Sequence, residues 1–233
     1  MLPLKTLRKP QSTPSATYTL IVINVLVFLW LIMQGQDKII SAYWQMGLVP
    51  CRITDNILTI HTVTDSITSM FLHGGWLHLV GNMFFLYLVG PLVEDYFGKT
   101  LFVIFYFLAG FGATFLHILF NSNVCIPAIG ASGAISGVMG AFLILYPATR
   151  FSMLAVFFRI PVGVINVQAF YILLYFFVWD LIDGLGAIGH TATGGVAVWA
   201  HVGGFIAGFL IAFVAIMFKP APEVDPFEYL DAD

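Results

Sequence analysis

Long apolar runs separated by short polar segments form the dominant pattern of this chain. Membrane-spanning helices need about 20 mostly apolar residues. Six runs reach or approach that length, at roughly residues 17–34, 76–93, 101–120, 132–147, 162–182 and 192–218. The fourth run is too short to span, so the loop before it is expected to dip into the membrane beside a hydrated cavity.

The connections between these runs differ in character. Residues 35–72 form a long first loop that is still apolar in places, and we expect it to lie in the membrane interface as helix. A plain structured loop is the alternative. Residues 151–158 (FSMLAVFF) are expected to lie along the inner surface. No cleavage site follows the first run, which we therefore interpret as a retained helix rather than a signal peptide.

The composition agrees with an integral membrane protein. Hydrophobic residues make up 60% of the 233 residues and charged residues only 9%, whereas soluble domains carry about 25% charged residues. The net charge of -3 is too small to suggest nucleic-acid binding. Two cysteines, Cys51 and Cys125, are too few for a disulfide scaffold, and a bond between them is the less favoured alternative.

The basic residues predict the orientation. With the N-terminus inside, the outer segments hold only Lys38 and Arg52 of the 9 Lys and Arg residues. Both termini are therefore expected in the cytoplasm. We divide the chain into a short cytoplasmic tail (1–16), a six-helix domain (17–218) and an acidic cytoplasmic tail expected to be disordered (219–233).

Four polar side chains share one depth in the predicted membrane. Ser132, His201 and His78 lie 15 to 17 residues from the inner ends of their helices, which corresponds to about 22–26 Å. Asn82 lies at about 18 Å by the same measure. Since the hydrocarbon core is about 30 Å thick, this layer is close to the outer boundary. Polar groups at such depth are costly and therefore mark a candidate functional site.

These residue types suit acyl-transfer chemistry. A serine hydroxyl needs a base to remove its proton, and His201 can be that base for Ser132. The helix N-terminus at Ser132 offers unpaired N–H groups to a developing oxyanion. His78 and Asn82 are spaced i, i+4 on one helical face, and an amide such as that of Asn82 is typical of oxyanion holes.

Glycines accompany the candidate nucleophile and base. The small-xxx-small pairs are Gly133 with Gly137 and Gly204 with Gly208. Such pairs let two membrane helices approach closely, which would bring the serine within reach of the histidine. Gly130 permits a tight turn before the serine. Ordinary helix packing is the alternative explanation for these glycines.

Other polar residues are given structural roles. His73 and His78 do not share a helical face and no HExxH sequence exists, so no metal site is predicted. Glu94 is expected to satisfy backbone groups at the inner end of the second span. His117 and His190 are interpreted as structural.

Three motifs give the chain a resemblance to the rhomboid intramembrane serine proteases. FLHGGWLHLVGNMFFLYLVG (71–90) is similar to the family's second-helix motif, GASGAISG (130–137) to its G-x-S-G nucleophile motif, and AHVGGFIAG (200–208) to its sixth-helix motif. The similarity extends over about residues 17–218.

The resemblance implies an all-α membrane bundle of six helices that acts without a cofactor. It implies that Ser132 is the nucleophile and His201 the general base, in a dyad without an acidic third member. The oxyanion would be bound by His78, Asn82 and the backbone N–H of Ser132. Substrates would be transmembrane segments in the bilayer, cut near their outer ends and admitted past the fifth helix.

Two departures and two rival hypotheses remain. Tyr43-Trp44-Gln45 stands where many bacterial members have Trp-Arg, and Ser136 stands where some members place a tyrosine beneath the histidine. A rhomboid-fold protein that binds membrane clients without cutting them is the first rival, although such a protein would be expected to lack the serine or the histidine. A small transporter is the second, but the polar layer lies near one face and no inverted repeat is visible.

Overall fold

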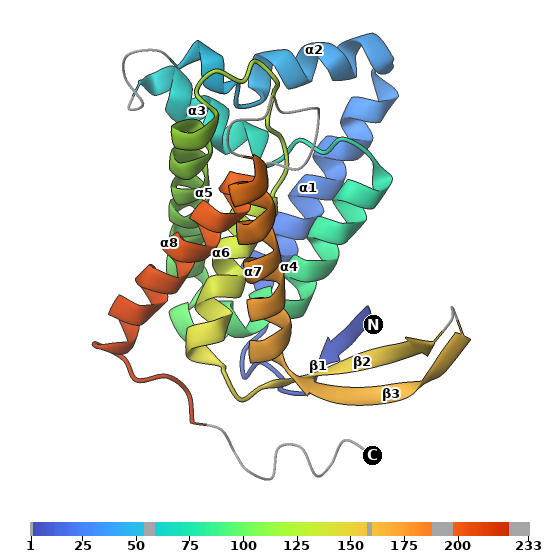
Figure 1. Cartoon of the computed structure of the whole chain (residues 1–233), viewed down its shortest axis with the longest axis vertical. Coiled ribbons are helices and arrows are strands. Elements are labelled where there is room, and N and C mark those ends of the chain that lie inside the picture. Colours follow the sequence, from blue (N-terminus) through green and yellow to red (C-terminus); the bar gives the residue numbers. More distant parts are fainter. Residues whose placement is uncertain (1, 54–58, 158–159, 188–197, 224–233) are drawn as a thin grey trace.

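The computed structural model describes residues 2–53, 59–157, 160–187 and 198–223. In Figure 1 the long helices form an upright bundle, with helices lying across its upper end and a small sheet at its lower end. The described part of the chain begins and ends at the end with the sheet. The start of the sixth predicted run and His190 lie outside the described residues.

Six helices of the described part of the chain make up the bundle. Five are long and apolar enough to cross a membrane: α1 (Ser15–Met33), α4 (Trp76–Phe97), α5 (Lys99–Asn121), α7 (Ala169–Ala187) and α8 (Val198–Ile216). The helix α6 (Ser132–Leu145) has only 14 residues. The predicted helical membrane bundle with a short fourth helix is therefore confirmed.

The short helix α6 lies at the centre of the bundle. It contacts α4, α5, α7 and α8, and side chains such as Val138 and Phe142 are fully buried. Because neighbouring helices cover it, α6 has little surface to present to lipid, and its loop can lie at membrane depth within protein.

Glycines allow α6 and α8 to touch backbone to backbone. A Cβ on Gly204 would lie 1.9 Å from the carbonyl oxygen of Gly133, and a Cβ on Gly208 would lie 1.9 Å from that of Gly137. Real Cβ atoms do not approach a backbone oxygen so closely. These positions therefore require glycine for the observed helix separation.

The first loop is largely helical, as predicted. It contains α2 (Gln36–Met46), a short 3-10 helix (Pro50–Arg52) and α3 (Ile60–Ser69). Figure 1 shows α2 running across the upper end of the bundle, nearly at right angles to the long helices.

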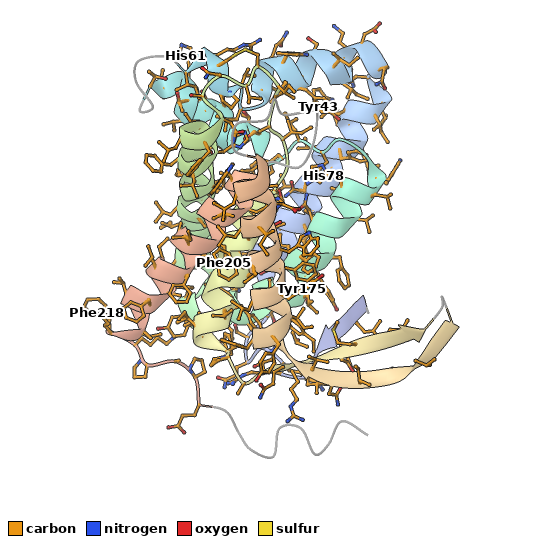
Figure 2. The ribbon with its side chains drawn as sticks, viewed as in Figure 1. Tyr43, His61, His78, Tyr175, Phe205 and Phe218 are labelled. Carbon is orange, nitrogen blue, oxygen red and sulfur yellow. A yellow bond between two sulfur atoms is a disulfide. The ribbon has the colours of Figure 1, made fainter. Side chains whose placement is uncertain are left out.

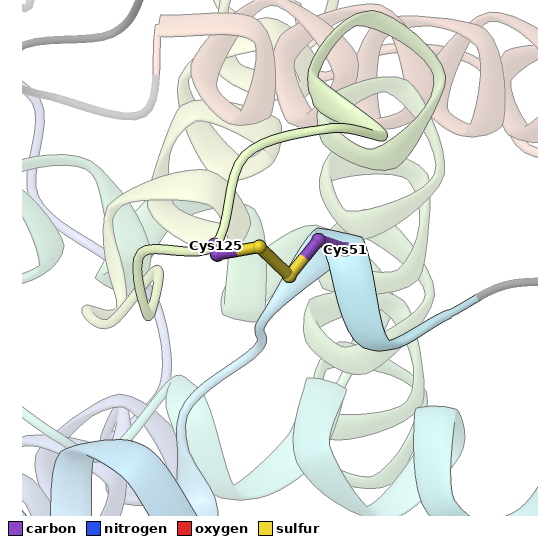
Figure 3. The surroundings of a disulfide bond; sticks show 2 residues. All are labelled: Cys51 and Cys125. Atoms are coloured by element: carbon purple, nitrogen blue, oxygen red, sulfur yellow. A yellow bond between two sulfur atoms is a disulfide. The ribbon is translucent and has the colours of Figure 1, made fainter.

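A disulfide between Cys51 and Cys125 joins this first loop to the loop before α6 (Figure 3). The two loops also pair through their backbones, since Leu48 and Ala128 exchange hydrogen bonds of 3.0 and 2.7 Å. The expectation that the two cysteines stay unpaired is therefore wrong. Sequence spacing could not reveal the pairing, because the cysteines are 74 residues apart.

A three-stranded antiparallel sheet at the lower end was not predicted. Its strands are β1 (Leu2–Thr6), β2 (Arg150–Phe157) and β3 (Ile160–Gln168), in the order β1-β2-β3. The predicted span at 162–182 was therefore wrong at its start, since its first residues form β3 and the helix begins at Ala169. This segment (IPVGVINVQ) is rich in β-branched residues, which favour a strand.

Acidic residues at the end of α4 hold the N-terminal segment. Glu94 is 1% exposed and accepts hydrogen bonds from the backbone N–H groups of Ala16 (2.9 Å) and Thr17 (2.7 Å) and from the Thr17 hydroxyl. Glu94 thus satisfies backbone groups, as expected, but those of the first turn of α1 rather than of its own helix.

The predicted C-terminal tail is described only over residues 219–223. Its first residue, Lys219, exchanges hydrogen bonds with Tyr96 of α4.

Candidate active site

Ser132 and His201 come into contact between α6 and α8. The hydroxyl oxygen of Ser132, the first residue of α6, lies 2.8 Å from Nε2 of His201 on α8. The residues are 69 positions apart and are brought together by the close α6–α8 packing. A hydrogen bond of this length is the arrangement that lets an imidazole take a hydroxyl proton.

The backbone before Ser132 turns sharply. Gly130 has a φ of +126°, which side chains rarely permit, and its N–H donates to the carbonyl oxygen of Ser69 at 2.8 Å. No side chain caps the N-terminus of α6. The N–H groups of its first turn have no intrahelical acceptor and can serve an oxyanion.

His78 presents a donor to this turn. Its Nδ1 accepts a hydrogen bond of 3.3 Å from the backbone N–H of Gly74, so in the neutral ring the proton lies on Nε2. A Cβ on Gly130 would lie 2.7 Å from that Nε2. Figure 2 shows His78 in the upper half of the bundle, far from Phe218 at the lower end of α8.

Asn82 lies one helical turn further along α4, beside the same loop. It is 7% exposed, and its Nδ2 has no hydrogen-bond partner among the described residues. A Cβ on Gly130 would lie 3.7 Å from that Nδ2. A buried donor without an acceptor costs free energy, which a negatively charged oxygen at this position would recover.

His73 packs against the ring of His78. It lies in the connection before α4 and is fully buried. Burial first, and then His78, lower the pKa of His73 to about 4, so this ring is neutral near pH 7. Its ring packs edge-on to that of His78 at 5.1 Å, and its carbonyl oxygen accepts a hydrogen bond from Tyr43 at 2.7 Å.

A cavity of about 40 Å³ adjoins Ser132. Its polar lining includes Ser66, Ser69, Thr114 and His117. A water molecule needs only about 10–15 Å³ of such space and two or more polar partners. The cavity can therefore hold a water molecule beside the Ser132 hydroxyl.

Asp180 is not among the site residues predicted from the sequence. Its Oδ2 lies 3.3 Å from Nδ1 of His201, whereas the resemblance implied no acidic neighbour and no Asp occurs beside His201 on its own helix. The carboxylate comes from α7 instead. An ionisable residue inside an apolar run was the signal available, since such residues are functional candidates by default.

Comparison with known proteins identifies the family. The family model described as the Rhomboid domain matches residues 61–218, a range that includes every residue of the site. The chain belongs to the rhomboid family. The three motifs that carried the resemblance lie within the matched region.

Known rhomboid relatives cover both plants and bacteria. The chain is 31% identical over 158 residues to "RHOMBOID-like protein 6, mitochondrial" of Arabidopsis thaliana, covering 65% of this chain and 43% of that protein. It is 28% identical over 200 residues to "Rhomboid protease GluP" of Bacillus subtilis (strain 168), covering 85% and 34%. "Inactive RHOMBOID-like protein 8" of Arabidopsis thaliana is 34% identical over 97 residues, covering 42% and 26%.

The chain thus spans less than half the length of these relatives. One of them is named a protease and another is named inactive. Family membership alone therefore leaves the choice between cutting and binding to the residues of the site.

Proposed function

We propose that this rhomboid protein is an intramembrane serine endopeptidase with Ser132 as nucleophile and His201 as general base. The observation that carries the proposal is the 2.8 Å contact between the Ser132 hydroxyl and His201 Nε2. The non-cleaving rival predicts a missing serine or histidine, and here both are present and in contact.

The proposed reaction proceeds through an acyl-enzyme. The Ser132 oxygen attacks the peptide carbonyl while its proton passes to His201 Nε2. The resulting oxyanion would lie among the His78 Nε2–H, the Asn82 amide and the first N–H groups of α6. The leaving amine takes the proton from His201. Water, deprotonated by the same ring, then attacks the acyl carbon. The bond to the Ser132 oxygen breaks, and that oxygen takes the proton back from His201. No cofactor or metal takes part.

The proposed substrates are transmembrane segments of other membrane proteins. The site lies within the bundle near the end that carries α2 and α3, so cleavage would occur near one end of a spanning segment. We place the protein in the inner (plasma) membrane, with both termini in the cytoplasm and the site opening to the outer side, because this orientation agrees with the distribution of Lys and Arg.

A fluorophosphonate probe tests the proposed nucleophile without knowledge of the substrate. The protein purified in detergent should be labelled covalently, and peptide mapping by mass spectrometry should locate the label on Ser132. Ser122→Ala removes an exposed hydroxyl at the end of α5; it is the control and should be labelled as fast as the wild type. A folded protein that takes up no label would instead support the client-binding function.

Replacement of the unpartnered amide tests the oxyanion hole. Asn82→Ala should lower kcat for substrate cleavage by about 10- to 1000-fold, the usual cost of one oxyanion donor. The value of KM should change little, because the donor acts on charge that develops only in the transition state. An unchanged kcat would remove Asn82 from the site.

A further inference from the structure

Both ring nitrogens of His201 have a polar partner. Nε2 contacts Ser132 at 2.8 Å and Nδ1 contacts Asp180 at 3.3 Å. The three residues come from three different helices, α6, α8 and α7. A carboxylate, an imidazole and a serine hydroxyl therefore form one continuous chain of polar contacts.

Two packing contacts hold Asp180 opposite His201. One turn before Asp180, Phe177 of α7 stacks on Phe205 of α8 with ring centroids 4.4 Å apart. One turn after Asp180, the lack of a side chain at Gly184 makes room for Trp199, whose ring would lie 3.2 Å from a Cβ there. The α7–α8 contact is thus fixed on both sides of the pair.

Asp180 places a carboxylate where it can stabilise a positive charge on the His201 ring. Two other histidines lie around the site, His78 of α4 beside Gly130 and His117 of α5 in the lining of the cavity, and neither carries a negative charge that could stabilise a positive His201 ring. Asp180 is the acidic group that faces Nδ1 of His201. The pair is partly shielded from solvent, with exposed fractions of 29% for Asp180 and 16% for His201.

We propose that Asp180 is a positioning residue for His201, an inference that rests on the proposed protease function. The ionised carboxylate accepts the Nδ1–H of the ring, which leaves the lone pair on Nε2 directed at Ser132. When the Ser132 proton moves to Nε2, the ring carries a positive charge beside the carboxylate, which itself stays ionised. The proton then leaves from Nε2 to the amine, and the ring returns to the same tautomer.

The rate of reaction tests this role with matched variants. Asp180→Asn should slow both fluorophosphonate labelling and kcat by about 10- to 100-fold with little change in KM, a smaller loss than in a fully buried triad because this pair is partly exposed. Asp180→Glu should restore part of the rate. Asp183→Asn removes an exposed carboxylate from the same helix and should leave the rate unchanged.

A second measurement follows the ring itself and needs no activity. In wild-type protein labelled with ¹⁵N-histidine, the NMR signals of the neutral His201 ring should show the proton on Nδ1, assigned by their loss in His201→Gln. In Asp180→Asn the Nδ1–H tautomer should lose population.

The outcomes separate the two proposals. Unlabelled wild-type protein would defeat the protease assignment, and the NMR result would then decide the Asp180 contact alone. Wild-type protein that is labelled, with Asp180→Asn reacting equally fast and keeping the same tautomer, would overturn the positioning role only. Slower reaction of Asp180→Asn together with a changed tautomer supports it.

Discussion

Ser132→Ala is expected to abolish cleavage of a membrane-spanning substrate, with a loss in kcat of about 10⁵- to 10⁶-fold. The reason is that the substitution removes the oxygen that forms the acyl-enzyme in the proposed reaction, while the other polar groups of the site remain. Cleavage of a reporter with one transmembrane segment, reconstituted in liposomes and followed by gel electrophoresis, measures the effect.

The same variant should remain folded. Ser132 is partly exposed and starts a helix without serving as its cap, so its Tm in detergent should stay within a few degrees of the wild type. Ser122→Ala, which removes an exposed hydroxyl at the end of α5, should retain full cleavage. Substantial cleavage by Ser132→Ala would show that another residue carries the chemistry.

Gly204→Val is expected to have the second largest effect, because it separates α6 from α8. The added Cβ would lie 1.9 Å from the Gly133 carbonyl oxygen, and a backbone oxygen cannot move without its helix. Overpacking of this kind costs about 1–3 kcal/mol or more. A shift of about 1 Å between reacting groups can cost about 100-fold in rate. We expect a lower Tm and a rate at least 100-fold lower.

Gly81→Val is the matched control for this prediction. Gly81 also lies within a membrane-spanning helix, but a Cβ there would meet nothing within 4 Å. Its Tm should be equal to or above that of the wild type, since valine has a higher helix propensity than glycine. Equal behaviour of the two variants in Tm and cleavage would contradict the requirement for close α6–α8 contact.

The sequence predicted the membrane bundle well because apolar length is a strong signal. The same signal misled at 162–168, where an apolar strand and the start of an apolar helix look alike. Polar residues are rare at membrane depth, which is why Ser132, His201, His78 and Asn82 stood out.

Asp180 shows what such reasoning leaves out. Its position along the chain says that it lies within a membrane-spanning helix, but not which neighbour that helix faces. The contact with His201 depends on how α7 is rotated and seated against α8, which is a property of packing between helices. The Cys51–Cys125 bond was missed for the same reason, since it depends on how two loops pair.

That disulfide has a consequence for where the protein can work. Cys125 lies seven residues before Ser132, so the bond anchors the loop that leads to the proposed nucleophile. Disulfides persist in oxidising compartments and are rare in the reducing cytosol, which supports a site that opens to the exterior. Thiol reductants would release this loop from the first loop, and the geometry around Ser132 would then respond to the redox poise of the surroundings.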